Sequence, residues 1–68
     1  MKKENYGAPL ERGVIEEITD GKYRVASITR DGIKSLPIPS IAKDTLSVGD
    51  KVLFYVFEDG DGLIIFRI

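Results

Sequence analysis

The sequence predicts an all-β domain, and the form that it favours is a small five-stranded barrel. Three observations support this prediction: one kind of turn dipeptide recurs along the chain, short apolar runs lie between the turns, and one longer connection precedes the fourth run. Short runs bounded by glycine and aspartate are typical of strands joined by tight turns. The predicted barrel covers residues 13–68. Residues 1–12 mix charge, glycine and proline without periodicity, so they are predicted to form a flexible N-terminal arm.

Asp-Gly pairs mark the predicted hairpin turns. A type I′ turn needs positive φ at both central residues, which glycine accepts freely and aspartate tolerates better than most residues. The pairs are Asp20-Gly21, Asp31-Gly32 and Asp59-Gly60. The runs that they and the longer connection separate are 14–18, 22–29, 33–38, 52–57 and 63–68. Each run is expected to form one strand.

The connection before the fourth strand distinguishes two barrel types. Pro37 and Pro39 flank Ile38, and proline cannot donate to a ladder, so the third strand is expected to end there or to lie at an edge. Residues 39–48 then form a connector with a 3₁₀ or short helical turn near residues 40–43. Because a connector of this length can hardly hold the helix that an OB-fold usually places there, an SH3-like roll is favoured over an OB-fold.

The last two predicted strands are apolar on both faces, whereas a single-layer barrel offers only one face to its core. The second face is either hidden by barrel curvature and the arm, or covered by another protein molecule. The second possibility predicts a protein interface on the outward side chains of these strands, through self-association or docking onto a partner. The candidate interface residues are Leu53, Tyr55, Phe57, Leu63 and Ile65.

Composition excludes several chemistries. The 68 residues contain neither cysteine nor histidine, which removes the common zinc ligands and the usual general base at neutral pH. We therefore expect no catalytic residue, no metal, no cofactor and no enzymatic activity. The three carboxylates of residues 58–62 lack the further ligands of a calcium loop and are expected to serve the turn. Since residues 1–12 contain no apolar run, neither a signal peptide nor a membrane anchor is expected, and a cytoplasmic location is predicted.

Single-stranded nucleic-acid binding is the alternative function. Small barrels often stack bases on exposed aromatic side chains beside basic ones. The candidate residues for this function are Tyr23, Arg24, Arg30 and Tyr55. The formal net charge of −1, with 10 basic and 11 acidic side chains, disfavours this alternative because nucleic-acid-binding domains are usually basic.

Four stretches carry a resemblance to a known group of proteins: KYRVAS at 22–27, RDGI at 30–33, VGDKV at 48–52 and FEDGDG at 57–62. With the residues between them, they resemble small barrel proteins found among the tail and baseplate genes of phages and prophages of Gram-positive bacteria. The resemblance implies a structural or assembly role, with no cofactor and no catalytic residue, and it would make the protein virion-associated.

Overall fold

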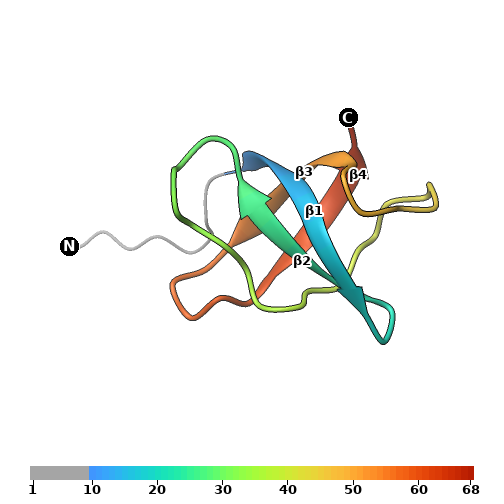
Figure 1. Ribbon diagram of the computed structural model, residues 1–68, viewed down its shortest axis with the longest axis horizontal. Coiled ribbons are helices and arrows are strands. Elements are labelled where there is room, and N and C mark those ends of the chain that lie inside the picture. Colours follow the sequence, from blue (N-terminus) through green and yellow to red (C-terminus); the bar gives the residue numbers. More distant parts are fainter. Residues whose placement is uncertain (1–9) are drawn as a thin grey trace.

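The computed structural model describes residues 10–68, which form one antiparallel sheet of four strands (Figure 1). The strands are β1 (Glu11–Thr19), β2 (Lys22–Ser27), β3 (Lys51–Val56) and β4 (Gly62–Arg67), in the spatial order β2-β1-β3-β4. The prediction of an all-β fold is confirmed. Two residues assigned to the predicted arm, Glu11 and Arg12, belong to β1, and residues 1–9 of that arm lie outside the described residues.

The turns lie at the predicted positions, but they are not all of the same type. The β1–β2 hairpin is a two-residue type I′ turn, with φ of 52° at Asp20 and 75° at Gly21. At the β3–β4 hairpin only Gly60 has positive φ, at 92°. There the Gly60 N–H donates to the Phe57 carbonyl at 2.9 Å and the Phe57 N–H donates to the Asp61 carbonyl at 2.7 Å. This hairpin therefore has a three-residue loop that ends in a left-handed glycine.

The prediction of a third strand over residues 33–38 is wrong, because this segment makes only isolated β-bridges. Beside β2, Lys34 bridges Ala26 and Ile38 bridges Tyr23. A continuous ladder is interrupted because Pro37 has no N–H and because the Ser35 hydroxyl, not a backbone carbonyl, accepts the Val25 N–H at 2.9 Å. The sheet accordingly has four strands where the sequence predicts five.

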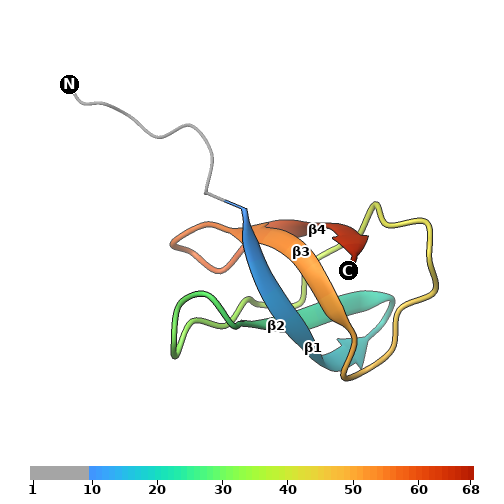
Figure 2. The same cartoon turned by 90° about the horizontal axis from the view of Figure 1, so that it is seen from above.

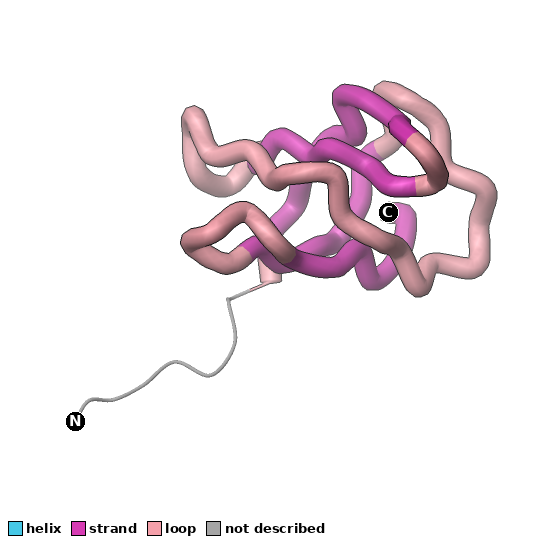
Figure 3. Tube along the Cα trace, turned by 90° about the horizontal axis from the view of Figure 1, so that it is seen from below, coloured by secondary structure: helices cyan, strands magenta, loops and turns pink. Residues whose placement is uncertain are grey.

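The same segment continues from β2 to β4 (Figure 3). Ser40 bridges Ile64 of β4, the Ile64 N–H donates to the Pro39 carbonyl at 3.0 Å, and the Ile41 N–H donates to the Ile64 carbonyl at 2.9 Å. Residues 10–68 contain no helix, so the predicted helical turn near residues 40–43 is wrong. The Ile41 N–H is already bound to β4, and the Ser40 hydroxyl accepts the Ala42 N–H at 2.9 Å, which leaves no helical hydrogen bond for either amide.

The core lies inside the curled sheet, between β2 and the β3–β4 hairpin (Figure 2). Its buried members alternate along the strands with residues on the other face, and they are Ile15, Val25, Ile38, Leu46, Val52, Phe54, Val56 and Ile64. At Gly13, β1 passes so close to its neighbours that an added Cβ would lie 2.5 Å from both Phe54 Cε1 and Val25 Cγ1. Only glycine fits at this point of the core.

Each hairpin contains one β-bulge. In β1 the register with β2 shifts between Ile15 and Glu17, and in β4 Leu53 pairs with Phe66 while Phe54 pairs with Ile64. Ile65 is therefore the extra residue of β4. By strict alternation Phe66 would share the core face with Ile64, but the bulge moves it to the opposite face.

Candidate interaction surface

The outward side of the β3–β4 hairpin is lined by apolar cross-strand pairs. Leu53 lies opposite Phe66 and Tyr55 lies opposite Leu63, on the face turned away from the buried Val52 and Phe54. We name this surface the outer apolar face. It consists of Leu53, Tyr55, Phe57, Leu63 and Phe66.

The exposure of this face varies along the hairpin. Leu53, Tyr55 and Leu63 are half-buried, whereas Phe57 is 42% and Phe66 49% exposed. The rings of Tyr55 and Phe57 contact edge to face with centroids 5.2 Å apart, so the two aromatic side chains form one continuous surface. None of these five side chains belongs to the buried core.

Four of the five predicted interface residues lie on this face, and the fifth does not pair with β3. Ile65 is the half-buried bulge residue. Sequence reasoning missed Phe66. Simple alternation places its side chain on the core face, but the bulge at Ile65 brings it to the outer face, opposite Leu53. Sequence reasoning also missed Ile28, whose N–H donates to the Arg12 carbonyl at 2.8 Å, so that Ile28 extends the row of Arg12 and Leu53 across the sheet. Nothing in the sequence indicates the β-bulge at Ile65.

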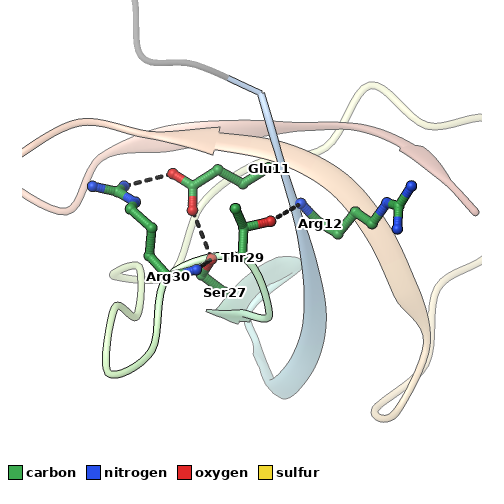
Figure 4. A network of polar contacts seen from close by, with 5 residues as sticks. All are labelled: Glu11, Arg12, Ser27, Thr29 and Arg30. Atoms are coloured by element: carbon green, nitrogen blue, oxygen red, sulfur yellow. Dashed lines mark hydrogen bonds and ion pairs between the residues drawn. The ribbon is translucent and has the colours of Figure 1, made fainter.

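A second cluster of interest surrounds Glu11, at the start of β1 (Figure 4). The Glu11 side chain is only 3% exposed. Its carboxylate accepts a hydrogen bond from the Ser27 hydroxyl at 2.6 Å and another from Arg30 Nη2 at 2.5 Å. The Arg30 N–H donates to Ser27 Oγ at 2.9 Å, so the loop after β2 is fastened to the start of β1. The neighbouring Arg12 points to the other side of the strand, as Figure 4 shows.

The Glu11 cluster keeps its carboxylate ionised. Burial alone would raise the pKa of Glu11, but the hydrogen bonds from Arg30 and Ser27 and the positive charge of Arg30 outweigh it, so the pKa lies below its ordinary value of 4.5. A general acid or base works best with a pKa near the working pH. Glu11 therefore has the character of a structural ion-pair partner.

Within residues 10–68, other carboxylates also form ion pairs or accept hydrogen bonds from backbone N–H groups in turns. Glu16 pairs with Lys34 at 3.3 Å, and Asp44 pairs with Arg67 at 3.6 Å. In the β3–β4 turn, Asp59 accepts the Asp61 N–H at 2.9 Å, as expected for turn chemistry. Nowhere in these residues do three acidic side chains converge as metal ligands would.

The residues of the nucleic-acid alternative are not gathered on one face. Tyr23 packs against the core from β2, and its neighbour Arg24 points the other way and pairs with Glu17 at 3.8 Å. Arg30 is bound to Glu11, as described above. Tyr55 belongs to the outer apolar face, two strands away from β2 in the sheet.

Comparison with known proteins returned no relationship: the chain matches no protein-family model and no curated protein. Residues 10–68 include no helix that is long and apolar enough to cross a membrane.

Proposed function

We propose that this protein is a non-enzymatic binding or assembly module that acts through protein–protein contacts made by the outer apolar face. The observation that carries the proposal is the pairing of Leu53 with Phe66 and of Tyr55 with Leu63 on the side of the sheet opposite the core. Two adjacent strands with apolar side chains on both faces need cover on both sides.

The energetic reason is the hydrophobic effect. Each Å² of apolar surface removed from water contributes about 25 cal/mol, so half-exposed aromatic side chains at Phe57 and Phe66 favour association. Scattered exposed apolar residues are normal on protein surfaces, whereas a contiguous patch marks an interaction site. The cross-strand pairs make this patch contiguous.

The electrostatics support a role without catalysis. The only buried carboxylate among residues 10–68 is that of Glu11, and its lowered pKa and two side-chain hydrogen bonds suit an anchor for the loop of Arg30. A buried carboxylate poised for proton transfer would have a raised pKa. We therefore assign the ionised Glu11–Arg30 pair a structural role and assign binding to the β3–β4 hairpin.

The proposal extends to the finer architecture. We infer that residues 33–41 serve as an irregular fifth strand, since they bridge β2 at Ala26 and Tyr23 and bridge β4 at Ile64. A strand in this place would close the sheet into the small SH3-like barrel that the sequence predicts. Closure would leave the outer apolar face of the hairpin available to a partner.

The resemblance to phage and prophage tail and baseplate proteins agrees with an assembly role, and we propose that the chain is a structural component of this kind. Genes for tail assembly on either side of its gene would support this origin. Genes for translation or repair in those places would instead favour the nucleic-acid alternative.

The binding proposal is tested with two variants of the face and one matched control. Tyr55→Asp and Phe66→Ser alter the outer apolar face, while Val48→Asp places the same charge at an apolar residue that is 61% exposed and lies in the loop before β3. Circular dichroism first establishes that each variant folds. Sedimentation velocity and affinity capture from the source cells then compare their associations.

We expect the unaltered chain and Val48→Asp to associate with the same protein, and Tyr55→Asp and Phe66→Ser to lose that association. A chain that sediments as a monomer and whose captured proteins are unchanged by both face variants would refute the proposal. Binding of a fluorescent single-stranded oligonucleotide at low salt and micromolar protein would instead support the alternative function, nucleic-acid binding.

A further inference from the structure

The β3–β4 hairpin carries opposite charges at its two ends. Lys51 is the first residue of β3, and by alternation with Leu53 its side chain lies on the outer side. At the other end, the turn contains Glu58, Asp59 and Asp61, all exposed. Within residues 10–68, neither Lys51 nor these three carboxylates take part in an ion pair. The outer apolar face lies between the two charged ends.

This arrangement is self-complementary. Two copies that face each other across a two-fold axis running across the strands have antiparallel hairpins, so the positive end of each lies over the negative end of the other. An axis parallel to the strands would set Lys51 over Lys51 and one acidic turn over the other. Like charges in contact across an interface repel each other, which disfavours that second packing.

We propose that the occupant of the outer apolar face is a second copy of this chain, packed face to face with its hairpin antiparallel and with Lys51 of each copy against the acidic turn of the other. This inference rests on the proposed function, and it names the partner. The aromatic and aliphatic side chains supply the association energy, while the charged ends select the orientation. A second copy carries both signs of charge at the matching ends of its own hairpin.

The dimensions of the hairpin suit such a packing. A six-residue strand is about 20 Å long, and packed sheets lie about 10 Å apart. Long side chains such as lysine and glutamate at the two ends of the hairpin can meet across that spacing. Leu53 and Tyr55 lie near the centre, where the two faces would exclude water.

Charge exchange tests the orientation. Lys51→Glu gives a chain whose hairpin is negative at both ends, and Glu58→Lys adds a cation at the acidic end. Glu58 is chosen because its side chain makes no hydrogen bond within residues 10–68, whereas the carboxylates of Asp59 and Asp61 accept backbone N–H groups of the turn. Lys22→Glu, at an exposed residue of β2, makes the same charge change away from the face.

Sedimentation equilibrium of the full chain at low ionic strength gives the dissociation constants. We expect the unaltered chain to dimerise, Lys51→Glu and Glu58→Lys each to weaken the homodimer about tenfold or more, and Lys22→Glu to change it less than about threefold. Mixing Lys51→Glu with Glu58→Lys should favour a heterodimer. In one of its two contacts the native Lys51 meets the unaltered acidic turn, and in the other the introduced glutamate meets the introduced lysine. Native mass spectrometry distinguishes this heterodimer from the two homodimers.

Three results would overturn the inference. A strictly monomeric unaltered chain would refute self-association, while the proposed function would stand if Tyr55→Asp still abolished binding to a different protein. Dimers that Lys22→Glu weakens as much as Lys51→Glu does would refute the specific contact. If Lys51→Glu and Glu58→Lys each weaken the homodimer but form no heterodimer when mixed, the antiparallel orientation is refuted.

Discussion

At the scale of single residues, Gly13 shows how little free space the core has. Its Cα faces Phe54 from β3 and Val25 from β2, and the Ala26 carbonyl lies 2.9 Å from the position that a Cβ would occupy. Two of the three closest atoms belong to side chains fixed in a buried core, and the third is backbone. A methyl group can enter only if the strands move apart.

Gly13→Ala is therefore expected to destabilise the fold, by about 1–3 kcal/mol, the usual cost of overpacking a filled core. Urea unfolding followed by tyrosine fluorescence measures the difference. Thr19→Ala, at an exposed residue of the same strand, is the control and should change stability by less than about 0.5 kcal/mol. Equal stability of Gly13→Ala and the unaltered chain would show that β1 and its neighbours can separate without loss.

Glu11 links the stability of the fold to pH. Because its folded pKa lies below the ordinary value of 4.5, the stability that it contributes is fully present above that value. The contribution is lost as the pH falls through the folded pKa, where the carboxylate is protonated and its attraction to Arg30 disappears. The ionised form thus holds the loop to β1 throughout the neutral range.

Glu11→Gln should remove this pH-dependent component. We expect the variant to be less stable than the unaltered chain at about pH 6, and the difference to narrow at about pH 3. Urea titrations at several pH values, with Glu58→Gln as an exposed control, give the two curves. A constant difference across this range would assign the effect to lost packing and not to charge.

At the scale of elements, the segment 33–41 contacts β2 and β4 through isolated bridges and forms no regular ladder. Its contacts with β2 combine backbone bonds with the Ser35 side chain: the Ser35 N–H donates to the Val25 carbonyl at 2.9 Å, and its hydroxyl accepts the Val25 N–H at 2.9 Å. Ser35 is itself buried, so no water molecule can readily replace its hydroxyl.

Ser35→Ala should leave the Val25 N–H buried without a partner, at a cost of about 1–3 kcal/mol. Hydrogen exchange should report faster exchange at Val25 and at Ser27, whose N–H donates to the Ile33 carbonyl at 2.8 Å. Ser47→Ala, at an exposed loop serine, is the matched control. Unchanged protection at Val25 would mean that the segment does not depend on this side chain.

The comparison of sequence and structure also belongs to this scale. The turn at Asp20-Gly21 and all four strands follow from turn chemistry and apolar runs, because both signals are local. The bulge at Ile65 and the irregular path of residues 33–41 depend on what lies opposite each residue in the sheet, which a single sequence does not reveal. For this reason the sequence predicts Leu53, Tyr55 and Leu63 on the outer face but misses Phe66.

At the scale of the whole molecule, the small core and the outer apolar face are connected. A chain of about 60 residues buries only about 60% of the surface that it exposes when unfolded, so its stability alone is marginal. Pairing of two outer faces adds burial that neither copy achieves by itself. In the proposed dimer, folding and association therefore stabilise each other.

The melting temperature should accordingly depend on protein concentration. We expect a rise of about 5 °C for a hundredfold increase in concentration of the unaltered chain, since mass action favours the folded dimer. Phe66→Ser, which removes an exposed side chain of the face, should melt at a temperature independent of concentration. Calorimetry at several concentrations measures both, and a constant melting temperature for the unaltered chain would contradict the coupling.

The central position of β1 has a consequence for the order in which the protein folds. β1 pairs locally with β2 and, across more than thirty intervening residues, with β3, so the sheet is complete only when β3 and β4 have joined the β1–β2 hairpin. Until then Ile15, Val25 and Ile38 lack the half of the core that β3 and β4 supply. The β1–β2 hairpin therefore exposes apolar side chains until β3 and β4 pack against it, and a chain in this partly folded state is prone to aggregate.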